Sequence, residues 1–295
     1  MLQLFSGGAE PKGLQIILNK LKFFIRRYPV ISSLIIMLLM SVMTEIKLEN
    51  LFTDSMGYQA AFYIRIALTQ GLVALAAAFI LSKLHILRRA GLTKPGSAKS
   101  LWLVWPIIIM SVLNGFSLLD GTMKIDFSRP LVDVLFLLAP ITTGFVEELV
   151  CRGFVLTVML DKYGRTKRGV YKAVLLSSVL FGLLHLMNLL TGRGSFIQVG
   201  SQVLYAIFFG VFFSAIFIRC KSLWPAIVAH AVFDFMGTVQ EIAVGSTFND
   251  TMGGNATLES ALISLAILSP LFFYGLFLLR KVPLSENAPE SSVVS

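Results

Sequence analysis

The chain has 295 residues, and its length alone would allow one or two soluble domains. Hydrophobic residues make up 56% of the sequence and charged residues only 14%, whereas a soluble domain carries about 25% charged residues. This composition excludes a soluble globular protein and predicts one that crosses a membrane several times. The net charge of +9 does not indicate nucleic-acid binding, because Lys and Arg gather at the ends of membrane helices.

Eight apolar segments are long enough to cross a bilayer core of roughly 30 Å. In chain order they cover residues 30–46, 60–81, 101–119, 131–160, 170–190, 199–218, 223–244 and 258–279. The fourth segment is longer than one crossing needs and contains Pro140 and Gly144, so we expect a tilt, a kink or a break there. The expected fold is an all-α membrane bundle of about eight helices.

Lys and Arg residues in the connections predict the orientation, because they are retained on the cytoplasmic side of a membrane. Nineteen of the 25 lie before the first span, in the connections after the second, fourth and sixth, at the start of the fifth span, or after the eighth. The opposite side has four: Lys47, Lys124, Arg129 and Arg193. Both termini are therefore predicted to be cytoplasmic. The short connections favour a multi-pass protein of a prokaryotic plasma membrane.

The spans divide the chain into five regions. Residues 1–28 form a cytoplasmic N-terminal segment, of which roughly the first 20 residues are expected to be flexible and polar. Residues 29–130 contain the first three spans, and residues 131–240 contain the fourth to the seventh. Residues 241–281 contain an outer loop and the last span, and residues 282–295 form a flexible cytoplasmic tail.

Ionisable side chains lie inside three of the predicted spans. They are Glu147, Glu148 and Arg152 in the fourth, His185 in the fifth, and His230 and Asp234 in the seventh. One charge at mid-bilayer costs about 2.5–3.5 kcal/mol on the translocon insertion scale, so these groups must face each other or water. Intramembrane ionisable groups of this kind indicate a functional site.

The spacing of these residues gives each side chain a direction. Glu148 and Arg152 are four residues apart, on one helix face, and can form an ion pair. His230 and Asp234 have the same spacing, whereas Glu147 points about 100° away from Glu148 around the helix. Each group lies part-way along its span from a cytoplasmic connection. We therefore expect one cavity inside the membrane that opens to the cytoplasm.

A free Glu, two His and an Asp in one cavity are suited to the attack of water on a carbonyl. A Glu in an apolar setting can act as a general base, and a neighbouring His can orient the water or share its proton. Further His and Asp groups can stabilise an oxyanion or hold a divalent metal. The predicted chemistry is the hydrolysis of a peptide bond.

Three short motifs occur in order on these three spans. Residues 147–152 fit E-E-x-x-x-R, residues 181–185 fit F-x-x-x-H, and residues 230–234 fit H-x-x-x-[N/D]. Together they resemble the family of CAAX prenyl endopeptidases and bacteriocin-processing proteins (CPBP), also called the ABI family of intramembrane proteases. The resemblance covers residues 131–240 and identifies them as a CPBP-like catalytic core.

The resemblance implies a role for each motif residue. Glu147 would activate the hydrolytic water together with His185, while His230 and Asp234 would line the oxyanion side or act as metal ligands. The supporting residues would be Glu148, Arg152 and Phe181, of which Phe181 lies one turn before His185 and can pack beside it. Family members have been described both as metalloproteases and as glutamate-dependent proteases. The resemblance therefore leaves open a divalent metal, such as zinc, at Glu147, His185, His230 and Asp234.

One position departs from the prenyl-endopeptidase pattern. Asp234 stands where that branch has Asn. An amide can donate a hydrogen bond to an oxyanion, and an ionised carboxylate cannot. Asp234 is therefore expected to be protonated, to orient His230 or to bind a cation, and a prenylated substrate is less strongly implied.

Two other functions are compatible with the same residues. Intramembrane Glu, His and Asp also build proton relays, as in a proton- or ion-coupled transporter, although such transporters have paired broken helices and this chain has one interrupted span. A catalytically silent member of the family would serve in bacteriocin immunity or as a scaffold. The expected protease acts near the cytoplasmic face. Its partners are a membrane-associated peptide or protein substrate and the lipid bilayer, not nucleic acid.

Overall fold

The computed structural model describes residues 11–246, 248 and 256–282, and most of these residues are helical. In chain order the helices are α1 (Lys12–Arg27), α2 (Pro29–Thr44), α3 (Thr53–Met56), α4 (Tyr58–Lys83), α5 (Ala98–Leu101), α6 (Trp105–Asn114), α7 (Phe116–Leu119), α8 (Pro130–Glu148), α9 (Thr157–Tyr163), α10 (Lys167–Leu184), α11 (Met187–Leu190), α12 (Phe196–Cys220), α13 (Trp224–Thr238) and α15 (Leu258–Arg280). Residues 249–255 of the predicted outer loop and residues 283–295 of the predicted tail lie outside the described residues.

Six of the described helical stretches are long and apolar enough to cross a membrane. They are Pro29–Leu51, Tyr58–Lys83, Pro130–Tyr163, Lys167–Leu190, Phe196–Cys220 and Leu258–Arg280. Each coincides with a predicted span, which confirms an all-α, polytopic membrane bundle. The other two predicted spans correspond to shorter helices, Trp102–Asn114 and Trp224–Thr238. Eight crossings and cytoplasmic termini stay predictions.

The fourth predicted span is not broken at Pro140 or Gly144, and its helix changes type further along the chain. α8 continues as an α-helix through Pro140 and Gly144, and the chain then forms a π-helix at Leu149–Leu156 before α9 begins. Pro140 removes one backbone hydrogen bond, a loss that packed membrane helices tolerate. All eight residues of the π-helix are buried. π-helical turns are frequent at functional sites, and this one follows directly after Glu148.

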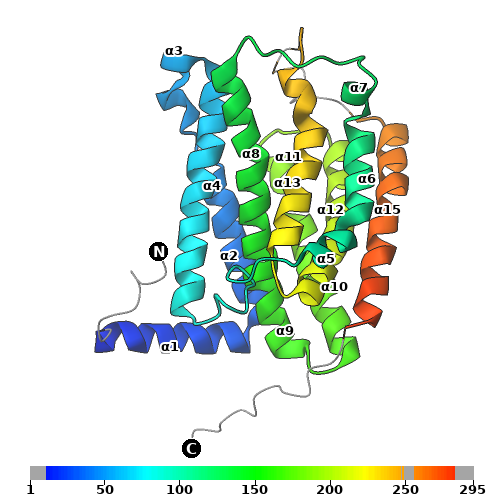
Figure 1. Cartoon of the computed structure of the whole chain (residues 1–295). Coiled ribbons are helices and arrows are strands. Elements are labelled where there is room, and N and C mark those ends of the chain that lie inside the picture. Colours follow the sequence, from blue (N-terminus) through cyan, green and yellow to red (C-terminus); the bar gives the residue numbers. More distant parts are fainter. Residues whose placement is uncertain (1–10, 247, 249–255, 283–295) are drawn as a thin grey trace, which may run out of the picture.

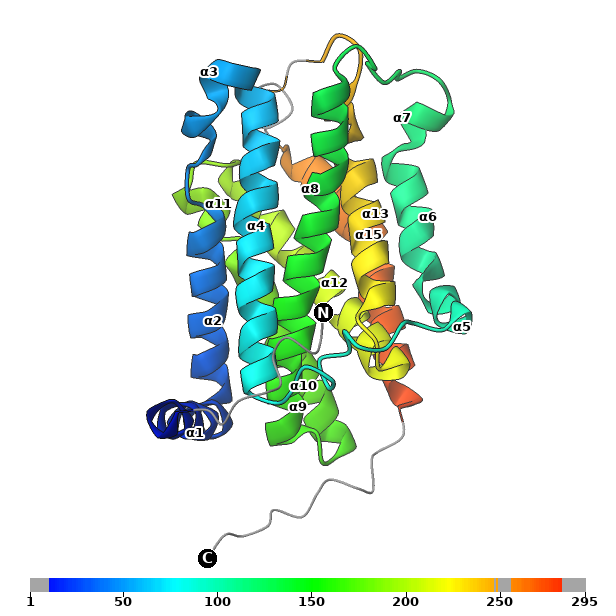
Figure 2. The ribbon, with the colours of Figure 1, turned by 60° about the vertical axis from the view of Figure 1, so that its left-hand side comes forward.

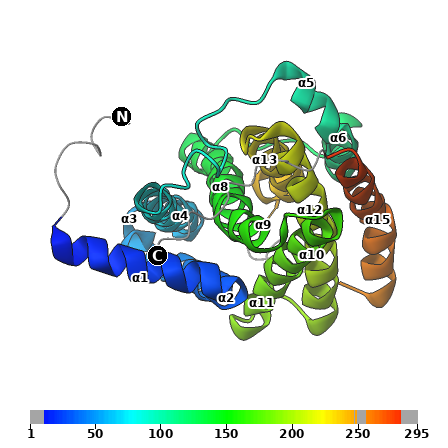
Figure 3. The same ribbon diagram turned by 90° about the horizontal axis from the view of Figure 1, so that it is seen from below.

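α1 lies across the lower end of the bundle instead of running along it (Figures 1 and 3). Its apolar face is formed by Leu14, Ile17, Leu18, Leu21, Phe24 and Ile25, and its basic residues, Lys12, Lys20, Lys22, Arg26 and Arg27, lie outside that face. This is the pattern of a helix that lies in a membrane surface. The expectation of a flexible segment is therefore wrong for residues 12–20, because these apolar residues recur at helical spacing. Residues 1–10 lie outside the described part of the chain.

α8 lies in the middle of the bundle, with α4 on one side and α13 on the other (Figures 1 and 2). A Cβ atom on Gly144 of α8 would lie 3.1 Å from the backbone nitrogen of Ala231 on α13. The missing side chain at Gly144 therefore lets α13 approach α8 closely, as small residues do between membrane helices. This contact lies one helical turn before Glu147 and Glu148, so it brings His230 of α13 within reach of both.

Candidate active site

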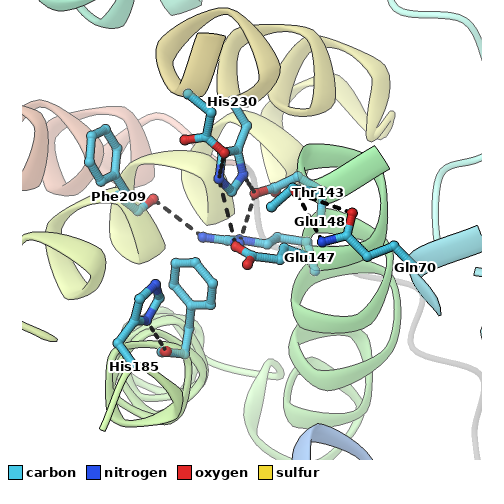
Figure 4. Close-up of polar contacts among 10 residues, drawn as sticks. Gln70, Thr143, Glu147, Glu148, His185, Phe209 and His230 are labelled. Atoms are coloured by element: carbon cyan, nitrogen blue, oxygen red, sulfur yellow. Dashed lines mark hydrogen bonds and ion pairs between the residues drawn. The ribbon is translucent and has the colours of Figure 1, made fainter. Parts of the chain in front are cut away.

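The two neighbouring carboxylates at the end of α8 have different surroundings (Figure 4). The side chain of Glu148 is 0% exposed, whereas that of Glu147 is 23% exposed. Helical spacing predicts that the two side chains point in different directions, and this is confirmed: they approach opposite nitrogens of one ring, that of His230. Glu148 approaches Nδ1 of His230, and Glu147 approaches Nε2 of the same ring.

The predicted ion pair between Glu148 and Arg152 is present and fully buried. Arg152 Nη1 donates to Glu148 Oε1 at 2.8 Å, and His230 Nδ1 lies 2.9 Å from the same oxygen. A carboxylate paired with a buried guanidinium only accepts hydrogen bonds, so Nδ1 of His230 is the donor in this contact. Glu148 therefore holds the orientation of His230, a contact between α8 and α13 that sequence reasoning did not predict.

The guanidinium of Arg152 is held from several directions. Its centre lies 4.6 Å from the ring centroid of Phe181 and 5.4 Å from that of Phe213, within the range of cation–π contacts. Its Nη2 donates to the backbone oxygen of Phe209 at 3.4 Å. Because Arg152 is almost completely buried, these contacts replace the water that its charge would otherwise need.

His230 presents its second nitrogen to two further carboxylates. Nε2 lies 3.7 Å from Oε2 of Glu147 and 3.5 Å from Oδ2 of Asp234. In a neutral ring that donates through Nδ1, Nε2 carries a lone pair, which would face two acceptors. At least one proton must therefore be shared among His230, Glu147 and Asp234. The ring itself is fixed by stacking on Phe213, with centroids 5.3 Å apart.

His185 lies at the end of α10, across the cavity from His230 (Figure 4). Its Nδ1 is 3.2 Å from the backbone oxygen of Phe181, and the edge of one ring meets the face of the other. A carbonyl only accepts hydrogen bonds, so Nδ1 donates and the neutral ring keeps a lone pair on Nε2. The predicted packing of Phe181 beside His185 is confirmed. Among the described residues, no direct hydrogen bond joins His185 to Glu147.

A cavity of about 220 Å³ brings together the motif residues other than Glu148 and Arg152. It is lined by Thr143, Glu147, Phe181, His185, Gln202, Tyr205, Ala206, Phe209, Phe213, His230, Phe233 and Asp234. The residues that sequence reasoning missed include Thr143, which exchanges hydrogen bonds of 2.9 and 3.1 Å with Gln70 of α4. The available signal was spacing, because Thr143 lies four residues before Glu147 on the same helix face.

A second cavity, of about 270 Å³, shares Glu147 and His185 with the first and continues to Glu45 and Arg193. The sequence predicted a cavity that opens to the cytoplasm, but Arg193 belongs to the charges assigned to the opposite side. The polar lining leads away from the predicted cytoplasmic end because the π-helix and the start of α9 fill the space below Glu147 with buried side chains.

The sequence allowed a divalent metal at Glu147, His185, His230 and Asp234, but these side chains are not arranged as a set of metal ligands. Within the described ranges, no three His, Cys, Asp or Glu side chains are placed to hold a metal ion together. His185 stands across the cavity from His230, so the two imidazoles do not converge on one point (Figure 4). These side chains do not fit a bound metal as they stand.

Comparison with known proteins identifies part of the chain. Residues 130–236 match the family described as type II CAAX prenyl endopeptidase, Rce1-like. The matched segment contains α8 to α13 except the last two residues of α13, and therefore all of the motif residues. No curated protein and no solved structure matches the chain.

Proposed function

We propose that this chain, whose residues 130–236 belong to the Rce1-like family of type II CAAX prenyl endopeptidases, is an endopeptidase that hydrolyses peptide bonds within the membrane. The family membership supports a protease, and the six apolar helices support an integral, multi-pass membrane protein. One observation carries the assignment of the base. Glu148 is occupied by Arg152 and His230, whereas Glu147 is left facing a cavity that also contains His185.

In the proposed reaction, a water molecule lies between the carboxylate of Glu147 and Nε2 of His185. Glu147 accepts a proton as the water oxygen attacks the carbonyl carbon of the substrate. The tetrahedral intermediate carries a negative charge, and His230 donates a hydrogen bond to it from protonated Nε2. The proton held by Glu147 then passes to the leaving amine, the C–N bond breaks, and two peptide ends are released.

Asp234 has a different role in this scheme from that of the Asn of the prenyl-endopeptidase pattern. Its Oδ2 lies 3.5 Å from Nε2 of His230 on the same helix face. An ionised carboxylate cannot donate to the oxyanion, but it favours the protonated imidazole that can. Asp234 therefore acts through His230, as a positioning residue, and Glu148 does the same from the other ring nitrogen.

The test is the replacement of Glu147 by Gln, which keeps the shape of the side chain and removes the base. Loss of a general base typically costs a factor of about 10² to 10⁴ in rate. We expect peptide ends that depend on the wild-type protein to disappear in cells that produce Glu147→Gln, as measured by proteomics of peptide termini.

The matched control is Asp133→Asn, a carboxylate-to-amide change in the first turn of the same helix. It should leave those termini unchanged, and both variants should be inserted and monodisperse in detergent. Termini that persist in the Glu147 variant would remove the assignment of the base. Termini that are absent even with the wild type would indicate a catalytically silent member of the family.

Metal dependence is a separate question with its own measurement. Because the described side chains do not form a metal site, we expect cleavage by the purified protein to survive EDTA and dialysis. Metal content measured by mass spectrometry should stay below one ion per chain. Activity that is lost on chelation and restored by Zn²⁺ would instead assign a metal to Glu147, His185, His230 or Asp234.

A further inference from the structure

The larger of the two cavities shows how a peptide can reach Glu147. It has a volume of about 270 Å³ and runs between α2, α4, α8, α10 and α11. At its inner end it shares Thr143, Glu147, Phe181, His185 and Gln202 with the smaller cavity. The two cavities are therefore parts of one space that meets at the proposed base.

The outer end of this space lies away from α1. α2 starts beside α1 and is 16 residues long, which is roughly 24 Å at 1.5 Å per residue. Glu45 follows the last residue of α2, and Arg193 lies in the connection from α11 to α12. Their side chains form an ion pair and are 25% and 37% exposed. In Figure 2, α11 lies near the upper end of α2, and α1 lies at its lower end.

The opposite direction, toward α1, is filled. Every residue from Glu148 to Met159 is buried, through the π-helix and into α9. Arg152, one helical turn after Glu148, is buried there against the rings of Phe181 and Phe213. In the described part of the chain, the polar path from Glu147 therefore leads to Glu45 and Arg193 and not to the α1 end.

The walls of this path suit a peptide better than an isoprenoid chain. Hydroxyl and amide side chains line it on several helices, beside apolar ones such as Met40, Phe62 and Ile66; the polar ones are Ser41, Thr44, Thr69, Gln70, Asn188 and Gln202. Asn188 donates to Gln202 at 2.8 Å, so these groups also support one another. A side-chain amide has two N–H donors and an oxygen with two lone pairs, so Asn188 and Gln202 keep hydrogen-bonding capacity beyond the bond between them. The backbone amides of a peptide can use that capacity, and hydrocarbon cannot.

We propose that the substrate is a polar peptide segment that reaches Glu147 from the end of the bundle opposite α1, past Glu45 and Arg193. The Lys and Arg distribution predicts that this end faces away from the cytoplasm. The scissile bond would then lie in a membrane-anchored or exported chain, on its non-cytoplasmic side, and not in a prenylated cytoplasmic C-terminus. This inference rests on the proposed function, because it assumes that Glu147 is where the bond is cleaved.

The first experiment measures access without measuring activity. In a background with Cys151→Ala and Cys220→Ser, one cysteine is introduced at Ser41, which lines the path and differs from Cys by one atom. The side controls are Thr122→Cys, in the loop before α8, and Lys162→Cys, at the end of α9, both exposed positions. A membrane-impermeant maleimide is applied to intact cells and to inverted vesicles.

We expect Ser41→Cys and Thr122→Cys to react in intact cells, and Lys162→Cys to react in inverted vesicles. Reaction of Ser41→Cys only from the Lys162 side, or from neither side, would overturn the access route. Reaction of Lys162→Cys in intact cells would overturn the assignment of this end to the non-cytoplasmic side.

The second experiment separates this inference from the proposed function. Peptide termini that depend on Glu147 are collected as described above and placed on the topology of the proteins that contain them. We expect them on the non-cytoplasmic side or in the adjacent half of the membrane. Glu147-dependent termini at cytoplasmic C-terminal ends would contradict the access route and leave the protease assignment intact. Termini that do not depend on Glu147 would contradict the protease assignment.

Discussion

Two clusters of ionisable side chains are buried in the bundle, and they differ in what their members contact. The α8–α13 cluster contains Glu147, Glu148, Arg152, His230 and Asp234. The α4 cluster contains Glu49, Tyr63, Arg65 and Glu241. By composition alone both would indicate intramembrane function. The contacts of their members show that the two have different roles.

In the α4 cluster, each charged group contacts a structural neighbour. Arg65 lies 3.3 Å from Glu49 and donates to the backbone oxygen of Thr44 at 2.6 Å. Tyr63 donates to Glu241 at 2.6 Å. These bonds tie α4 to the end of α2 and to the turn after α13. The cluster therefore fastens helix ends together.

The α8–α13 cluster has the same kind of buried ion pair, but it also has two carboxylates that face a cavity. Glu148 and Arg152 are almost completely buried, whereas Glu147 and Asp234 are 23% and 29% exposed. An ionisable group that is both held in place and reachable can act on a substrate. The comparison shows that the candidate site is distinguished by accessible carboxylates next to a buried ion pair. A buried ion pair without such carboxylates, as in the α4 cluster, does not indicate a site.

The largest effect on stability should come from breaking the buried pair. Arg152→Met leaves Glu148 buried without its guanidinium partner and with only His230 bonded to it, so we expect the free energy of unfolding to fall by about 3–5 kcal/mol. The double variant Glu148→Gln with Arg152→Met carries no unpaired charge there, and its amide oxygen can still accept from His230. It should recover most of the loss. Thermal unfolding in detergent measures both, and a double variant as unstable as the single would contradict the pairing.

A smaller effect is expected where α8 and α13 touch. Gly144→Ala places a Cβ 3.1 Å from the nitrogen of Ala231 and 3.2 Å from the oxygen of Ile227, both backbone atoms that must shift. Such overpacking typically costs about 1–3 kcal/mol, and the shift would move His230 away from Glu147 and Glu148. Cleavage should therefore fall together with stability.

Gly71→Ala is the matched control, because it also lies inside a long helix and has open space around its Cβ position. It should retain full cleavage and gain stability, if anything, from the helix preference of Ala. Equal losses in the two glycine variants would show that the effect at Gly144 is not due to its contact with α13.

The smallest effect should come from the α4 cluster. Tyr63→Phe removes the hydrogen bond to Glu241, and a typical hydrogen bond contributes about 0.5–1.5 kcal/mol to stability. We expect a small decrease in the unfolding temperature and an unchanged rate of cleavage for the folded fraction. A decrease in kcat at unchanged stability would place this cluster in the chemistry and contradict the distinction drawn above.

The sequence predicted the membrane bundle well, because an apolar run long enough to cross a bilayer must form a helix to satisfy its backbone hydrogen bonds. Six predicted spans coincide with the long helices, and spacing of four residues correctly paired Glu148 with Arg152. The expectation of a flexible segment was wrong for residues 12–20, which belong to α1 and carry apolar residues at helical spacing. The π-helix after Glu148 has no signal in hydropathy, so the sequence pointed only to Pro140 and Gly144, where α8 is not broken.

Sequence by itself determined which groups are available for chemistry, since motif residues and helical spacing are local properties. The tertiary structure alone decided how they are used. Because α13 approaches α8 closely at Gly144, His230 can bond to Glu148, while Glu147 faces the cavity. The packing below the site directs the polar path toward Glu45 and Arg193. Spacing along a helix fixes the direction of a side chain, but its partners depend on which other helix lies in that direction.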